Sequence, residues 1–220
     1  MKTKLVLLHF YPGLLILAFY LLAAPFAVSN GFPGMIALLA AEVVILVPIG
    51  FMHLKGRKTP FNSRPRVWWV LLGLVACIVL YAPMFPVGLW ARTHMFSWLP
   101  SWFYDPGFDW ASRQALIITF SLGIVIDGVI GPVVEEVYFR GYLLPQMKGS
   151  WAPLVNATLF TLYHFWQPHN YPAIFMVSLV LSYAAWWTKS VWVSMGIHCL
   201  VNIIGSATGL AAAIGGIKPY

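Results

Sequence analysis

The stretch that decides the fold is Gly131-Pro132-Val133-Val134-Glu135-Glu136-Val137-Tyr138-Phe139-Arg140-Gly141, in which two adjacent carboxylates and an arginine interrupt an apolar run. An ionisable side chain at bilayer depth costs roughly 2.5–3.5 kcal/mol on insertion scales. Three such groups in one short segment therefore need compensating partners, which the remaining sequence must supply.

The whole chain has the composition of a multi-pass membrane protein. Of its 220 residues, 60% are hydrophobic and only 9% are charged, whereas soluble globular proteins have about 25% charged residues. The formal net charge of +7 is better explained by basic loops at one membrane face than by nucleic-acid binding. Cys77 and Cys199 lie in apolar runs and indicate no disulfide framework.

The apolar runs predict an all-α, polytopic transmembrane bundle of about seven or eight spans. The expected spans are residues 5–28, 34–53, 67–89, 113–147, 151–166, 171–187 and 190–215. Residues 90–112 are rich in aromatic residues and prolines, and we interpret them as a re-entrant or interfacial loop that covers the site.

The run from Arg113 to Met147 is too long for one straight span. At 1.5 Å per residue it would reach about 50 Å, against roughly 30 Å of hydrocarbon. Gly128, Gly131 and Pro132 predict a kink there, because proline suits the first turn of a new helix. This kinked span would carry the two glutamates just beyond the kink.

The basic residues predict the orientation of the chain. With a cytoplasmic N-terminus, all of the 13 basic residues except Arg92, Arg113 and Lys218 fall on the cytoplasmic side, as the positive-inside rule requires. The run 5–28 is too long for the apolar core of a signal peptide, so we expect it to be retained. The short loops favour a prokaryotic plasma (inner) membrane.

Helix geometry separates the roles of the two glutamates. Adjacent helical residues point about 100° apart, and Glu136 and Arg140 have the i, i+4 spacing and order that favour an ion pair. Glu135 is left without a partner on its own helix and is available as a general base. The alternative is an interhelical ion pair, with Glu135 facing water near the cytoplasmic interface.

Each of two later spans carries polar side chains along one face of its own helix. Asn156, Phe160 and His164 follow one another at i, i+4 spacing, as do His198 and Asn202. Each set alone is as typical of interhelical hydrogen bonding as of a site. Together with a carboxylate they supply what hydrolysis needs, namely groups that activate water and groups that donate to an oxyanion.

Other hydrolytic classes lack their motifs in this chain. There is no G-x-S-x-G nucleophile elbow and no H-E-x-x-H zinc motif. A Glu/His/His set would still be able to bind a metal, but we predict neither a metal nor a cofactor.

The three motifs resemble those of the CAAX protease and bacteriocin-processing family of intramembrane glutamic endopeptidases, which includes the type II CAAX prenyl endopeptidases. The resemblance rests on Glu135-Glu136-x-x-x-Arg140, Phe160-x-x-x-His164 and His198-x-x-x-Asn202, and it covers about residues 113–205. It implies a metal-independent protease built as a helical bundle of about eight spans, with a cavity open to the membrane and the cytoplasm.

The resemblance also implies a role for each motif residue. Glu135 would activate water with help from His164, and His198 and Asn202 would form the oxyanion hole. Glu136 and Arg140 would support them. The substrate would be a membrane-associated peptide or protein, prenylated or of the bacteriocin or signalling type. Residues 113–220 would form the catalytic core, and residues 1–112 the N-terminal helices and aromatic loop.

Two other functions stay open at this point. One is a non-catalytic scaffold or regulator, of the self-immunity type, that reuses the same fold. The other is a small transporter with Glu42, Asp127 and Glu135 as a proton relay, although no paired broken half-helices occur. Asp127, like Phe160 and Asn156, is a candidate for lining the cavity, and Glu42 otherwise suits interhelical hydrogen bonding.

Overall fold

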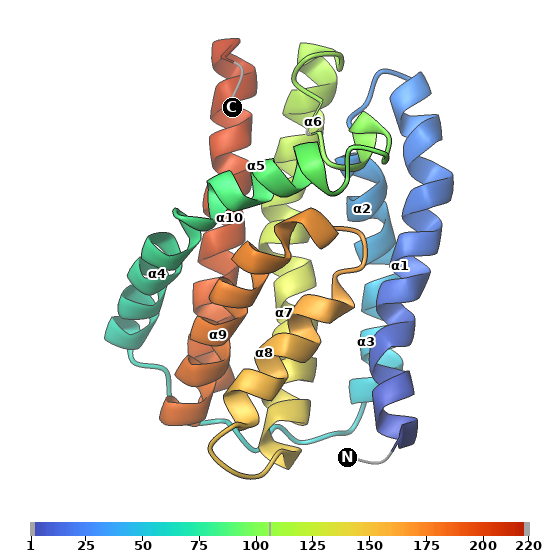
Figure 1. Cartoon of the computed structure of the whole chain (residues 1–220). Helices are drawn as coiled ribbons and strands as arrows, with labels where there is room; N and C mark the ends of the chain where they lie inside the picture. The colour runs from blue at the N-terminus through green and yellow to red at the C-terminus, as the bar shows by residue number, and fades with distance from the viewer. Residues whose placement is uncertain (1–2, 106, 218–220) are drawn as a thin grey trace.

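The chain folds into a bundle of helices (Figure 1). The computed structural model describes residues 3–105 and 107–217, and within them the ordered elements are helical except for a β-bridge between Asn62 and Ser190. This confirms the all-α class. The α-helices are α1 (Thr3–Ser29), α2 (Met35–Ala41), α3 (Val47–Leu54), α4 (Val67–Tyr81), α5 (Met84–His94), α6 (Arg113–Val125), α7 (Gly131–Glu136), α8 (Ala152–Tyr163), α9 (Tyr171–Thr188) and α10 (Val191–Gly215).

Five helical segments in the described part of the chain are long and apolar enough to cross a membrane. They are residues 9–29, 35–54, 113–146, 168–188 and 191–215, and α4 with α5 would make a sixth. By length and composition this gives five or six candidate spans in the described residues, against the seven or eight expected. Residues 151–166 form only the 12-residue helix α8, and the span expected at residues 67–89 is divided between α4 and α5. At 1.5 Å per residue α8 reaches about 18 Å, short of the hydrocarbon thickness. The protein is nevertheless an integral membrane protein.

The span expected at residues 67–89 is broken in the structure. Helix α4 ends at Tyr81, and α5 begins at Met84 at an angle of 43° to it. Pro83 explains the break, because proline disfavours the helical conformation of the residue before it and donates no backbone hydrogen bond. Helix α5 then runs across the bundle (Figure 1) and continues to His94, so the aromatic stretch begins as helix instead of loop.

The segment that contains Pro132 is one helical stretch from Arg113 to Gln146. The expected irregularity takes the form of a π-helical turn, Ile126–Ile130, directly before α7, and a second π-helical turn, Val137–Leu143, follows α7. Pro132 lies in the first turn of α7. Its ring would clash with the carbonyl four residues earlier in a regular helix, and a wider turn relieves that conflict.

The core of the bundle is aromatic and lies between α1, α8 and the Val137–Leu143 turn. Tyr20, Phe139, Phe160 and Tyr163 are each at most 3% exposed and belong to one apolar cluster. The segment that follows α5 is bound to this core through α1. The hydroxyl of Tyr20 in α1 donates a hydrogen bond to the backbone carbonyl of Trp102 at 3.0 Å. These contacts fix α8 against the glutamate-bearing stretch.

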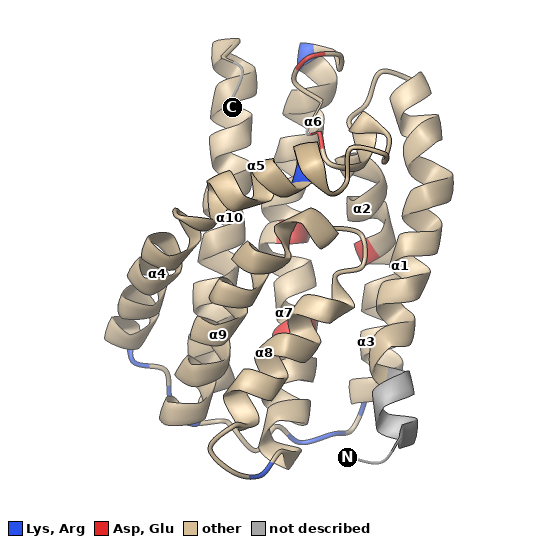
Figure 2. Ribbon diagram, in the orientation of Figure 1, with Lys and Arg blue, Asp and Glu red and all other residues tan. Residues whose placement is uncertain are grey.

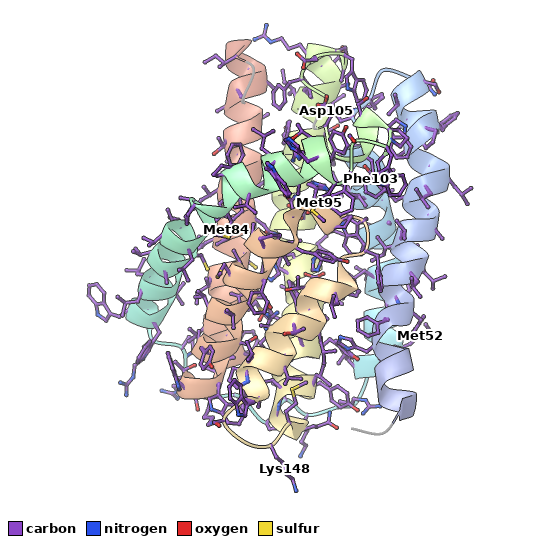
Figure 3. All side chains as sticks on the ribbon, viewed as in Figure 1. Met52, Met84, Met95, Phe103, Asp105 and Lys148 are labelled. Carbon is purple, nitrogen blue, oxygen red and sulfur yellow. The ribbon has the colours of Figure 1, made fainter. Side chains whose placement is uncertain are left out.

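The outer surface of the bundle is apolar. Leu22, Phe26 and Trp68 are 81%, 73% and 71% exposed, which in a soluble protein would be unfavourable but suits contact with lipid. Figure 2 shows the basic residues gathered mainly in the loops at the lower end of the view, with acidic residues inside the bundle and near its upper end. Lys148 lies at this end and Asp105 at the other (Figure 3).

Candidate active site

Glu135 lies between two histidines that come from other helices. Its side chain is on α7 and is 9% exposed. One carboxylate oxygen lies 3.9 Å from Nε2 of His164, and the other lies 3.9 Å from Nε2 of His198 in α10. These distances are too long for direct hydrogen bonds, but one water molecule can contact both groups of either pair.

His164 owes its position to the end of α8. The helix stops at Tyr163, and His164 leaves it with a ψ angle of 55°. Its Nδ1 is 2.8 Å from the carbonyl oxygen of Phe160. Because a carbonyl only accepts, Nδ1 is the donor, and in the neutral ring Nε2 is an acceptor that faces Glu135.

Glu136 points away from Glu135 and contacts two cationic or polar partners. Its Oε1 accepts from Arg140 Nη1 at 2.8 Å and from His198 Nδ1 at 3.0 Å. The sequence predicts the first contact but gave no sign of the second. Glu136 thereby holds the ring of His198 so that its Nε2 faces Glu135, which is the role of a carboxylate behind a catalytic histidine.

Arg140 is fully buried and is held by two serines that sequence reasoning missed. Its Nη2 donates to Ser178 Oγ at 2.6 Å and lies 3.4 Å from Ser182 Oγ. The guanidinium also lies 4.4 Å from the ring centroid of Phe160, a cation–π contact. The i, i+4 spacing of the serines in the apolar helix α9 is a sequence signal, because a buried arginine needs several acceptors.

Asn156 belongs to the same buried polar layer. Its Nδ2 donates to the carbonyl of Phe139 at 2.9 Å, and its Oδ1 accepts from Ser182 Oγ at 3.0 Å. It links α8, α9 and the Val137–Leu143 turn and is not among the cavity-lining residues. Its role in the structure is therefore to hold the helices together.

Asn202 lies one turn after His198 in α10 and is oriented by Asp127. Its Nδ2 donates to the Asp127 backbone carbonyl at 2.9 Å and lies 3.3 Å from Asp127 Oδ1. Asp127 reaches it from the Ile126–Ile130 π-helical turn. Sequence reasoning left the direction of Asp127 open because the irregular backbone before Pro132 shifts the helical register.

A cavity of about 250 Å³ brings these side chains together. Its lining includes Glu135, His164, His198 and Asn202 together with Phe160 and Asp127. Glu42, from the π-helical turn Glu42–Leu46, lines the same cavity. None of the described residues among 90–112 lines this cavity, so the aromatic segment does not form part of its wall.

The geometry suits a bound water molecule. Both histidines direct an Nε2 lone pair towards Glu135 when their rings are neutral, and an ionised Glu135 only accepts hydrogen bonds. Three converging acceptors need a donor with two hydrogens, which water supplies. A carboxylate that holds water beside a histidine is the arrangement needed for general-base hydrolysis.

No set of three or more His, Cys, Asp or Glu side chains among the described residues is arranged to hold a metal ion.

The fold and the buried carboxylate–histidine centre define the chain as a polytopic membrane protein with a site inside its helical bundle. Residues 116–204 match the family model described as type II CAAX prenyl endopeptidase Rce1-like. No curated protein and no solved structure matches the chain.

The match over residues 116–204 supports a relationship of this part of the chain to the CAAX protease and bacteriocin-processing family. The matched residues contain all three motifs, from Glu135 to Asn202, and extend from α6 to α10. At the level of that family, the match supports a membrane-embedded protease that acts on membrane-associated substrates.

Proposed function

We propose that this chain is an intramembrane endopeptidase that hydrolyses a peptide bond of a membrane-associated or lipidated peptide or protein. The observation that carries the proposal is the position of Glu135 between the Nε2 atoms of His164 and His198, each 3.9 Å away. A water bound there has a carboxylate to take its proton and a neutral histidine to orient it.

In the proposed reaction, the water oxygen attacks the carbonyl carbon of the scissile bond and Glu135 accepts the water proton. The C–N bond then breaks, and the proton passes from Glu135 to the departing nitrogen, so the carboxylate is restored. His164 orients the water through its Nε2, since its Nδ1 is occupied by the Phe160 carbonyl.

His198 and Asn202 form the oxyanion hole in this proposal. His198 donates from Nε2 when its ring carries a second proton, and the Glu136 carboxylate at 3.0 Å from Nδ1 is the counter-ion that such a ring needs. Asn202 Nδ2 lies 2.9 Å from the Asp127 backbone carbonyl and 3.3 Å from Asp127 Oδ1. We infer that these two oxygens share one amide hydrogen and orient the amide, so that the other hydrogen can donate to the oxyanion.

The test is cleavage of membrane peptides by the purified protein in neutral detergent. We expect Glu135→Gln to lower kcat by about 100-fold or more, since positioned general bases contribute factors of that order. Asp105→Asn is the matched control, because its carboxylate bonds the Gly107 amide in a loop outside the cavity.

Two outcomes would contradict the proposal. Cleavage that survives Glu135→Gln would remove the proposed base, and loss of cleavage in the presence of chelators would assign the water activation to a metal ion. A cellular phenotype that is unchanged by Glu135→Gln would instead favour the scaffold or regulator.

A further inference from the structure

Glu42 is a carboxylate of the cavity that the proposed hydrolysis does not use. It begins the π-helical turn Glu42–Leu46 and lines the cavity that contains Glu135. Its carboxylate lies against Gly131, where an added Cβ would come within 2.5 Å of Oε2. Gly131 is one helical turn before Glu135, so the two carboxylates face the cavity from neighbouring positions.

The Oε2 atom of Glu42 is buried and has no hydrogen-bond partner. An unpartnered polar atom of this kind is unfavourable in a protein interior and commonly marks a missing ligand or water. The Glu42 carboxylate therefore requires a hydrogen-bond donor that the protein itself does not supply.

Tyr163 provides a second and independent observation. It is 2% exposed and lines the same cavity, and its hydroxyl is also buried without a partner. Tyr163 is the last residue of α8 and directly precedes His164, so both residues belong to the same wall of the cavity. Two unsatisfied polar groups in one cavity wall indicate a polar occupant.

The charge of the cavity indicates which occupant. Its lining includes three carboxylates, those of Glu42, Asp127 and Glu135, and neither lysine nor arginine. The buried Arg140 is not among the lining residues and is bound to Glu136 and Ser178. A cavity lined by three carboxylates and by the aromatic rings of Tyr81 and Trp166 can bind an organic cation through ion pairing and cation–π contacts.

We propose that Glu42 and Tyr163 form a subsite that binds an organic cation, an ammonium or a guanidinium, beside the scissile bond. The proposal rests on the proposed endopeptidase function for its biological meaning. Two sources have this chemistry: a lysine or arginine side chain of the substrate, and the amino group that hydrolysis creates on the departing fragment.

A binding experiment tests the cation independently of catalysis. Hexylammonium and hexanol, which differ in the charged group, are titrated by calorimetry into the full-length protein in neutral detergent. We expect the wild type to bind hexylammonium at least tenfold more tightly than hexanol, because only the ammonium can form an ion pair with the Glu42 carboxylate. Glu42→Gln should remove this preference, and Asp105→Asn should keep it.

Tyr163→Phe distinguishes loss of the subsite from loss of folding, because it removes only the hydroxyl and keeps the packed ring. It should reduce the preference for hexylammonium while the protein keeps its elution volume and its melting temperature. Equal binding of the two probes to the wild type, or a preference that survives Glu42→Gln, would overturn the subsite.

A cleavage experiment distinguishes the two sources of the cation. Peptides that carry lysine or norleucine at each position flanking the cut are compared on wild type and Glu42→Gln. A lysine preference of tenfold or more that Glu42→Gln abolishes assigns the subsite to a side chain. Product inhibition by a fragment with a free amino terminus, weaker for its acetylated form and lost in Glu42→Gln, assigns it to the new amino group.

The two proposals fail separately. If neither cleavage pattern occurs in a protein that cleaves, the cation subsite is wrong and the endopeptidase stands. If no peptide is cleaved, the endopeptidase fails, and the binding of hexylammonium still decides whether the cation subsite exists.

Discussion

At the scale of single residues, the two adjacent glutamates have opposite environments. Glu136 is fully buried and contacts Arg140 and His198 at 2.8 and 3.0 Å, whereas the histidine nitrogens nearest to Glu135 lie 3.9 Å away, beyond hydrogen-bond distance. Burying an ion pair is tolerable only when further hydrogen bonds satisfy both partners, and removal of one partner costs about 3–5 kcal/mol. Ser178 supplies such a bond to Arg140. Glu136, which is ion-paired, is therefore structural, and Glu135, which has no such pair, is the carboxylate available for chemistry.

The residue-scale prediction concerns Asp127. Asp127→Ala removes the 3.3 Å contact to the Asn202 amide but keeps the backbone contact, so the amide should lose its fixed orientation. We expect kcat to fall roughly tenfold to a hundredfold, less than the loss of an oxyanion donor itself, with KM little changed. Steady-state kinetics on one cleaved peptide measure this.

Asp127→Asn separates this positioning role from a general loss of structure. An asparagine keeps an oxygen that accepts from Asn202, so it should restore most of kcat. Equal losses in the alanine and asparagine variants would contradict the role of Asp127, and Asp105→Ala serves as a control outside the cavity.

At the scale of helices, the irregular turns lie around the site. The three π-helical turns are Glu42–Leu46, Ile126–Ile130 and Val137–Leu143, and they carry Glu42, Asp127 and Arg140. A π-helical turn widens the helix by one residue and changes the direction of the side chains that follow. Glu42 and Asp127 line the cavity from two of these turns, so the irregular segments contribute side chains to the candidate site.

The element-scale prediction concerns the contact between α1 and α8. Gly13 in α1 packs on the backbone of Tyr163, and an added Cβ would lie 3.0 Å from the Tyr163 ring and closer still to its carbonyl. Gly13→Ala should therefore displace the end of α8 that holds His164. We expect a lower melting temperature and lower kcat.

Gly205→Ala in α10 is the matched substitution, because nothing lies within 4 Å of its added Cβ. It should be neutral or slightly stabilising, since alanine is the better helix former. Thermal unfolding and peptide cleavage by both variants measure the difference. Equal behaviour of the two alanine variants would show that close α1–α8 packing does not position His164.

At the scale of the whole molecule, the basic loops define one end of the bundle. Figure 2 shows the blue loops at the lower end of the view, and Lys148 projects from that end in Figure 3. Lys2 and Lys218 lie outside the described residues. We propose that this end faces the cytoplasm, as the positive-inside rule favours.

Cysteine labelling in intact cells tests the orientation. In a background without Cys77 and Cys199, a membrane-impermeant maleimide should label Asp109→Cys from outside. Lys148→Cys should react only after the membrane is permeabilised. The reverse pattern would mean that the chain is inserted in the opposite direction.

The sequence predicted much of the site because helical periodicity is local. The spacing of Glu136 and Arg140 was sufficient to predict their ion pair, which the structure forms at 2.8 Å. The same spacing predicted that His198 and Asn202 share a face. It did not predict that Ser178 and Ser182 bind Arg140, since contacts between helices depend on packing that periodicity does not encode.

The sequence by itself determined that the chain is a helical membrane protein and which side chains are costly to bury, because hydropathy and helix spacing follow directly from residue order. Only the tertiary structure decided how many helices are long enough to cross the membrane. It also decided that Glu42 lines the cavity and that Asn156 does not. The reason is that proline breaks and π-helical turns rotate the side chains that follow, and the direction of each is fixed only by packing against neighbouring helices. The sequence thus predicted His164 and His198 as candidate partners of Glu135. Their Nε2 atoms lie 3.9 Å from its carboxylate because α7, α8 and α10 pack together.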